Sequence, residues 1–272
     1  MSKSLKTLIA AVVIVGGVSS VAIADGYDYE YEPVGKSFAA PPIFAWTGWY
    51  AGMNAGWIRS QTDSKRRVTG VFETLFADFY PRSLSNDQDG FLAGLTLGYN
   101  QKMGAAFVGG VEADIAYTDI DGSQTRSITG PDPLPPFGTR TQTTRLSQEM
   151  NWFGTVRARA GWLASQQMLL YVTGGLAYAD LETRGSATVV PTGALPFTAS
   201  GKSSDWKAGW TVGGGLEWLM GNKTTFKGEY LYYDLNDTSV TGATTAFPGS
   251  TATYKNENTG HIIRMGLNVG LY

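Results

Sequence analysis

The sequence predicts an all-β chain that folds as an eight-stranded antiparallel up-and-down barrel with an outer wall facing lipid. Eight segments alternate apolar with small or polar residues at a period of two, and the connectors between them alternate between short and long. Charged residues make up only 16% of the 272 residues, against roughly 25% in an ordinary soluble domain. Together these features are typical of a transmembrane barrel with short periplasmic turns and long extracellular loops.

The N-terminal 24 residues have the composition of a removable signal peptide. A basic start and an apolar run over residues 8–15 precede the cleavage-type sequence Ala22-Ile23-Ala24. A retained helical anchor needs about 20 uninterrupted apolar residues, and glycines and serines break this run. Residues 25–45 are acidic, aromatic and interrupted by prolines, which predicts a flexible periplasmic segment. The barrel is expected over residues 46–272.

Each predicted strand presents the same two faces. In residues 49–57 the odd positions read Trp, Ala, Met, Ala, Trp, and the even positions read Tyr, Gly, Asn, Gly. One face is therefore apolar with aromatic ends, and the other is small and polar. The other predicted strands are residues 90–100, 105–117, 150–163, 168–180, 206–220, 224–235 and 260–272.

The connectors are expected to divide by length between the two rims. The short ones, residues 101–104, 164–167 and 221–223, suit periplasmic turns. The long ones are rich in Ser, Thr, Gly, Asp and Pro and are expected to be extracellular loops. They are residues 59–89, 118–149, 181–205 and 236–259.

The composition of the second face indicates which way the apolar face looks. A water-facing surface is densely charged, but this face holds mostly Gly, Thr, Asn, Ala and Tyr, which fit the crowded interior of an eight-stranded barrel. A soluble barrel with the apolar face inside is the alternative. Outward aromatic residues near the strand ends are expected at the membrane interfaces. They are Trp49, Trp57, Tyr99, Tyr117, Trp152, Trp162, Trp206, Trp218, Tyr230 and Tyr232.

Arg157 and Arg159 occupy the small and polar face of residues 150–163. On the lipid face near the midplane each would cost roughly 2 to 4 kcal/mol, so both are expected to point inward. An unpaired buried charge is strongly destabilising, and Glu112 and Asp114 on the preceding strand are the expected neighbours. Barrel shear decides which carboxylate meets which guanidinium. The full predicted interior network is Glu112, Asp114, Arg157, Arg159, Lys207, Glu217, Lys227, Glu229 and Arg264.

The reactive side chains do not predict an enzyme. One histidine and no cysteine make a poor start for a metal site, and no cofactor is expected. His261 has the lipid-facing phase at the start of the last strand and is interpreted as an interfacial residue. The net charge of −2 argues against nucleic acid as a partner.

Four ordered motifs resemble a known family. They are WTGWYAG at 46–52, GTVRARAG at 154–161, YVTGGLAY at 171–178 and EYLYYDL at 229–235. The chain resembles the outer-membrane immunogenic, porin-like family of proteobacteria, whose members look like the OmpA transmembrane barrel. The resemblance implies an integral protein of the Gram-negative outer membrane, with roles in envelope integrity and surface contact and, for some members, proposed passage of small solutes.

Two functions therefore stay open from the sequence: a structural and surface-interaction barrel with a charged interior plug, and a narrow pore or small-ligand conduit. The expected partners are outer-membrane lipid and lipopolysaccharide, the barrel-assembly machinery during biogenesis, and a host or surface ligand. The cationic segments 65–67 and 140–145 are candidates for the surface contacts. The family usually ends on an outward aromatic residue that the assembly machinery reads, whereas here Leu271 holds that phase and Tyr272 follows it.

Overall fold

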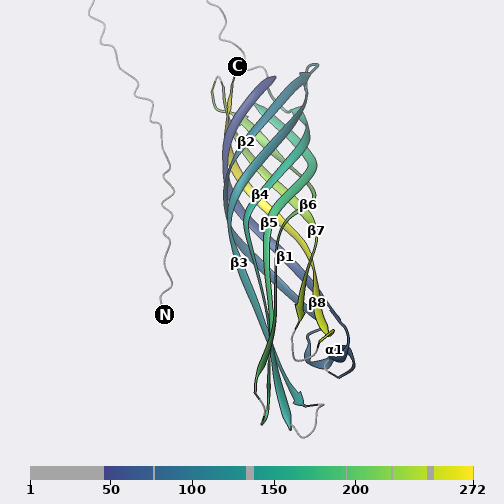
Figure 1. Cartoon of the computed structure of the whole chain (residues 1–272). Helices are drawn as coiled ribbons and strands as arrows, with labels where there is room; N and C mark the ends of the chain where they lie inside the picture. The colour runs from purple at the N-terminus through teal and green to yellow at the C-terminus, as the bar shows by residue number, and fades with distance from the viewer. Residues whose placement is uncertain are drawn as a thin grey trace, which may run out of the picture. The chain divides into compact units, whose positions relative to one another are not determined.

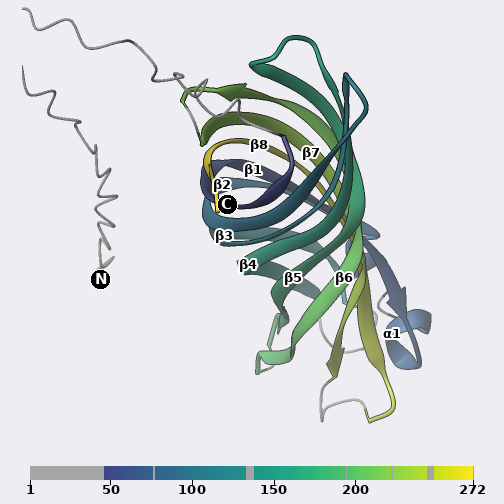
Figure 2. The same cartoon turned by 90° about the horizontal axis from the view of Figure 1, so that it is seen from above.

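The chain forms a closed barrel of eight antiparallel strands, each paired with the next and β8 paired with β1 (Figures 1 and 2). This confirms the predicted fold class. No helix in the described part of the chain is long and apolar enough to cross a membrane. The predicted signal peptide, residues 25–45 and Tyr272 lie outside the described residues. The computed structural model describes residues 46–75, 77–132, 138–193, 195–221, 223–243 and 248–271.

All eight strands are at least 20 residues long. Between β1 and β2 lie a short helix, α1 (Val71–Thr74), and a 3-10 turn, η1 (Ala77–Phe79). The strands are β1 (Gly48–Val68), β2 (Ser83–Met103), β3 (Phe107–Pro131), β4 (Thr139–Leu163), β5 (Met168–Pro191), β6 (Phe197–Leu219), β7 (Thr224–Ala243) and β8 (Thr251–Gly270).

The predicted long loops are mostly strand, which corrects the sequence reading. β3 and β4 continue through most of residues 118–149, and Figure 1 shows their hairpin extending to the end opposite the short turns. Here the outward positions carry hydroxyl and charged side chains, so the apolar alternation ends while the backbone ladder continues. Hydroxyl pairs cross the strands, as between Ser127 and Thr143 at 2.9 Å. The short connectors lie close to the predicted positions, although β2 runs on through Met103.

The barrel wall loosens toward its long end. The ladder between β2 and β3 begins at the pair Leu92–Thr118, so the outer half of β3 has no ladder partner on β2. The ladder between β6 and β7 shifts register between Ser200 and Gly209. As a result, the backbone ladder that joins the extended parts of β3 to β6 to one another does not continue onto β2 and is irregular toward β7.

The apolar face looks outward, as membrane insertion requires. Met53 on β1 and Val172 on β5 are both 65% exposed on the isolated barrel. The structure places all ten predicted interface aromatics on this outer face. Tyr99 and Tyr232 are half-buried because each packs on a neighbouring tryptophan, with ring centroids 5.4 Å apart for Trp49–Tyr99 and for Trp210–Tyr232.

A charged belt follows the outer aromatic residues toward the long end of the barrel. Its residues point outward and form ion pairs such as Arg59–Asp87 at 3.2 Å and Lys65–Glu257 at 2.6 Å. A belt of this kind marks where the wall leaves the hydrocarbon and enters the headgroup and aqueous zones. The belt consists of Arg59, Lys65, Asp87, Glu149, Glu182, Arg184, Lys202, Asp237, Lys255 and Glu257.

Candidate functional site: the barrel interior

A charge network fills the interior at the level of the membrane. Its members extend inward from β3, β4, β6, β7 and β8, and each is at most 5% exposed. Four carboxylates face four cations, so the network is neutral in charge. The charge network consists of Glu112, Asp114, Arg157, Arg159, Glu217, Lys227, Glu229 and Arg264.

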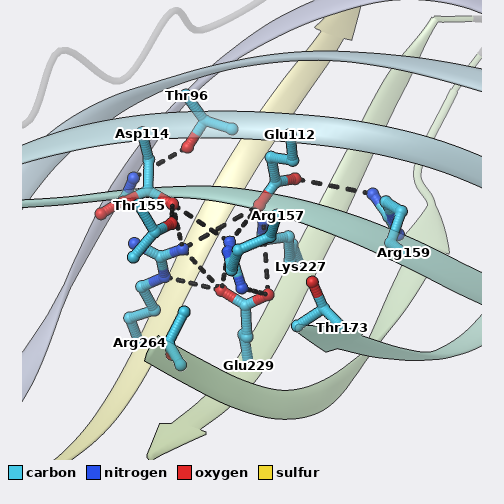
Figure 3. A network of polar contacts seen from close by, with 12 residues as sticks. Thr96, Glu112, Asp114, Thr155, Arg157, Arg159, Thr173, Lys227, Glu229 and Arg264 are labelled. Atoms are coloured by element: carbon cyan, nitrogen blue, oxygen red, sulfur yellow. Dashed lines mark hydrogen bonds and ion pairs between the residues drawn. The ribbon is translucent and has the colours of Figure 1, made fainter. Parts of the chain in front are cut away.

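Arg157 lies at the centre of the charge network (Figure 3). Its Nη2 donates to Glu112 and to Asp114 Oδ2 at 3.1 Å, and its Nη1 donates to Glu229 Oε1 at 2.8 Å. Glu112 is the direct cross-strand partner of Arg157, so the predicted neighbours do meet. Glu229 comes from β7 on another part of the wall and could not be assigned from the sequence.

Two further cations complete this group. Arg264 Nε donates to Glu229 Oε2 at 2.7 Å, and its Nη2 donates to Asp114 Oδ2 at 2.8 Å. Lys227 Nζ donates to Glu112 Oε1 at 2.6 Å. Each of the three carboxylates is therefore shared by at least two cations, which is how a buried charge avoids being left alone.

Arg159 forms a second group next to the first. Its Nη1 donates to Glu217 Oε1 at 2.8 Å and to the Tyr50 hydroxyl at 3.0 Å. Its guanidinium lies 4.0 Å from the ring centroid of Tyr171, within cation–π range. The Tyr50 hydroxyl in turn donates to Glu112 Oε2 at 2.7 Å and so links the two groups.

Tyr50 and Tyr171 also belong to the site, although neither is among the residues predicted from the sequence. The signal was present, because Tyr50 has the inward phase of its strand. Gly98 makes room for its ring: a Cβ at Gly98 would lie 2.3 Å from the Tyr50 ring. Tyr171 donates its hydroxyl to Glu229 Oε1 at 2.9 Å. The tyrosines thus tie β1 and β5 to the charge network.

Lys207 does not join the charge network, so that part of the prediction is wrong. It has the inward phase of β6, but it pairs in register with Ala179, nearer the outer end than Glu217. Its Nζ lies 3.6 Å from Asp205 Oδ2, and its side chain is 23% exposed. Parity gives the side of the wall but not the height along the barrel, and Lys207 lies beyond the membrane-level network.

An apolar layer, which was not predicted from the sequence, closes the interior on the side of the charge network that faces away from the short turns. Along β4 the inward positions run from Arg157 through Thr155 to Phe153, and along β8 from Arg264 to Ile262. Every member is at most 4% exposed. The layer consists of Ile58, Leu92, Ala116, Ile120, Met150, Phe153, Ala177, Ala179, Leu181, Leu231, Tyr233, Leu235 and Ile262.

Two further layers of side chains fill the rest of the lumen, one toward the short turns and one beyond the apolar layer. Toward the short turns, Trp46 packs with Val108, Leu163 and Leu169. A cavity of about 20 Å³ lies beside this cluster and is lined in part by Trp46. This volume has room for about one water molecule. Beyond the apolar layer lies an amide layer in which Gln148 Nε2 donates to Asn258 Oδ1 at 2.9 Å.

His261 lies on the outer surface among tyrosines. Its Nδ1 is 2.7 Å from the Tyr230 hydroxyl, and the ring of Tyr232 packs against it at 5.3 Å. No group of three or more His, Asp or Glu side chains within the described ranges could hold a metal ion. These contacts with Tyr230 and Tyr232 are typical of a residue at the membrane interface.

The predicted cationic segments contribute only part of their charge to the surface. Lys65 is exposed, but Arg66 donates to the carbonyl oxygens of Ala77 and Tyr80 and so holds η1. Arg140 is buried, its guanidinium 5.3 Å from the ring centroid of Phe79. Burial lowers the pKa of Arg140 below its ordinary value.

The closed eight-stranded wall, its apolar outer band and the aromatic residues at its rims define a transmembrane β-barrel of the outer-membrane class. Residues 37–262 match the family described as outer membrane protein beta-barrel domain. The chain belongs to this family and is an integral outer-membrane protein of a Gram-negative bacterium. The localisation expected from the sequence is therefore confirmed.

Characterised relatives support the resemblance. The 31 kDa outer-membrane immunogenic proteins of Brucella melitensis and Brucella suis are each 31% identical to the chain over 244 residues. The alignment covers 87% of this chain and 88% of each relative. Among solved structures, the outer membrane protein OprG from Pseudomonas aeruginosa has a TM-score of 0.45 and 11% identity, covering 84% of this chain and 99% of that one. The predicted family resemblance is confirmed.

Proposed function

We propose that the protein is a closed structural barrel that contributes to envelope integrity and presents its extended outer strands for surface contact. The observation that carries this proposal is the filled interior, in which a neutral charge network and an apolar layer lie one above the other. A narrow channel or small-ligand conduit is the competing function. The proposed function has no catalytic step. The one histidine of the sequence, His261, contacts the tyrosines Tyr230 and Tyr232.

The charge network braces the wall across the lumen. Arg157 on β4 reaches Glu229 on β7, and Arg264 on β8 reaches Asp114 on β3, although neither pair of strands is adjacent. Ion pairs between non-adjacent strands oppose flattening or shear of the barrel. The backbone hydrogen bonds connect only neighbouring strands and so do not brace the barrel across the lumen. We infer that the inward charges serve the rigidity of the wall.

Opening a path for ions would be costly at two levels. Freeing Arg157 from its carboxylates breaks buried pairs, and such a loss costs about 3 to 5 kcal/mol. A hydrated path would then have to pass Phe153 and Ile262, which are 1% and 0% exposed. The two barriers differ in chemistry, so one change of charge or pH does not remove both.

Planar-bilayer conductance of the refolded mature chain tests this proposal. The wild-type protein is expected to give no stable channels. Arg157→Ala is the probing variant, and Val156→Ala, which alters the adjacent lipid-facing residue, is the matched control. Heat-modifiable migration on a gel establishes that each variant is folded. Reproducible wild-type channels whose size changes with Arg157→Ala but not with Val156→Ala would overturn the closed-barrel proposal and favour the conduit.

A further inference from the structure

The extended part of β3 has one edge without a hydrogen-bonded neighbour. The ladder between β2 and β3 begins at the pair Leu92–Thr118, and beyond Thr118 β3 has ladder partners only on β4. A side-chain contact continues as far as Gln124, whose Nε2 donates to Asn86 Oδ1 at 3.3 Å. Residues 125–131 have no hydrogen bond to β2 among the described residues. Alternate residues of such an edge leave a backbone N–H and C=O unpaired.

A notch of about 290 Å³ lies against this edge. Its opposite side is formed by η1, the residues that follow it and the first residue of β2. Arg126 and Ile128 of β3 line the notch, and both have the inward phase of their strand. That phase is buried at Glu112, at the level of the membrane, whereas Arg126 is exposed, so the wall is open to solvent beside the notch. We define the notch by Asp78, Pro81, Arg82, Arg126 and Ile128.

The lining of the notch favours an acidic group. Arg82 and Arg126 are both exposed, and neither forms an ion pair with a described residue. Asp78 is the one carboxylate among the described lining residues, so two cations face one carboxylate and the net charge is positive. Beside the notch, Arg66 holds η1 through backbone carbonyl oxygens and adds a further positive charge. An acidic side chain that enters the notch therefore meets cations that the described part of the chain does not neutralise.

We propose that residues 125–129 of β3 accept an extended segment of a partner protein as an added antiparallel strand, with an acidic side chain opposite Arg126. Strand addition to an exposed edge supplies main-chain hydrogen bonds, and alternate side chains give the specificity. An apolar side chain is expected opposite Ile128, because Ile128 shares the phase of Arg126. A hydroxyl is expected opposite Ser127, which pairs with the Thr143 hydroxyl at 2.9 Å on its other side. The preferred sequence is therefore apolar, then Ser or Thr, then acidic.

The added strand comes from a different protein and not from a second copy of this chain. Antiparallel pairing, which is the more stable arrangement per residue, would relate two β3 edges by a two-fold axis perpendicular to the sheet. That axis would turn one of the two barrels upside down in the membrane. The inference rests on the proposed role in surface contact and names the partner as an acidic extended peptide. Conductance tests the lumen and peptide binding tests this edge, so the two proposals can fail separately.

Fluorescence anisotropy of a labelled peptide, Thr-Val-Thr-Glu-Thr, titrated with the folded mature chain in detergent measures this binding. In the antiparallel register the glutamate lies opposite Arg126 and the valine opposite Ile128. Arg126→Glu is the probing variant, and Arg145→Glu makes the same change of charge at an exposed residue of β4, the cross-strand partner of Thr125. Arg126→Glu is expected to bind about tenfold more weakly, because like charges then lie directly opposite, and Arg145→Glu is expected to stay within about twofold. The peptide Thr-Val-Thr-Lys-Thr is expected to restore binding to the Arg126→Glu variant.

Backbone pairing has a control of its own. Only alternate residues of an added strand donate an N–H to β3, so N-methylation of the valine and glutamate is compared with N-methylation of the threonines. One of these two peptides is expected to bind about tenfold more weakly, since it loses its main-chain hydrogen bonds to the edge, and the other is expected to bind nearly as well as the unmodified peptide.

Three outcomes would overturn the proposal. Equal effects of the two methylated peptides would exclude strand addition. Equal losses for Arg126→Glu and Arg145→Glu would mean a diffuse attraction of charge without a site. Absence of binding to the folded wild-type chain at millimolar peptide would exclude the site itself. Heat-modifiable migration of each variant establishes that a loss of binding is not a loss of fold.

Discussion

Replacing Arg157 tests whether the charge network acts as one balanced unit. Arg157→Leu leaves four carboxylates facing the three cations Arg159, Lys227 and Arg264. Glu112→Gln creates the opposite imbalance. Removing one partner of a buried pair costs about 3 to 5 kcal/mol, which is a large share of the 5 to 15 kcal/mol typical of a whole domain. Both single variants are therefore expected to be strongly destabilised.

The double variant Arg157→Leu/Glu112→Gln restores neutrality, with three carboxylates and three cations. It is expected to be more stable than the sum of the two single losses predicts, by about 2 to 3 kcal/mol, since contacting charges couple by up to about that amount. Urea unfolding in phospholipid vesicles, followed by tryptophan fluorescence, measures the free energies.

An exposed pair provides the matched control for this cycle. Arg59 and Asp87 are 3.2 Å apart, but their side chains are 57% and 54% exposed. The cycle Arg59→Leu/Asp87→Asn is expected to give a coupling of no more than about 1 kcal/mol. Losses that add at the Arg157–Glu112 pair, or a coupling equal to that of the exposed pair, would refute the balanced-network reasoning.

Two further predictions follow from the packing of the interior. Gly98→Ala is expected to lower the free energy of unfolding by about 1 to 3 kcal/mol, because its Cβ would come within 2.3 Å of the Tyr50 ring. Gly228→Ala on the wall, which meets nothing within 4 Å, is the control in the same urea assay. Phe153→Ala is expected to cost about 3 to 5 kcal/mol by leaving a cavity in the apolar layer, yet to give no bilayer channels because the charge network still closes the lumen. Conductance of folded Phe153→Ala would contradict the two-barrier interior.

The sequence predicts those features of the site that depend on local geometry. The period of two is a property of the extended backbone, so the inward direction of Arg157 and Arg159 follows from neighbouring residues alone. The adjacency of β3 and β4 follows from their order in the chain. The contacts of Arg157 with Glu229 on β7 depend on barrel shear and diameter, which no local pattern encodes.

The extended outer strands and the apolar layer were not predicted for a different reason. The surroundings of the outer face change along each strand from hydrocarbon to water. Phe153 is apolar and faces inward, while Thr143 on the same strand is polar and faces outward. A rule that equates apolar with outward holds only within the hydrocarbon. Beyond the hydrocarbon, this rule predicts loops where the strands in fact continue. Inside the lumen, it does not predict the apolar layer.

The order of the layers in the lumen explains why a charged interior is compatible with a closed barrel. A neutral network alone would be a polar core open to water at its outer end, where hydration competes with each ion pair. The apolar layer of Phe153 and Ile262 separates that network from the amide layer above it and keeps bulk water away from the charges. In such a setting a balanced set of ions holds its geometry, whereas an unbalanced set destabilises the wall. The replacement of one charge is therefore expected to destabilise strands on every side of the barrel. The replacement of a balanced pair is expected to destabilise few of them.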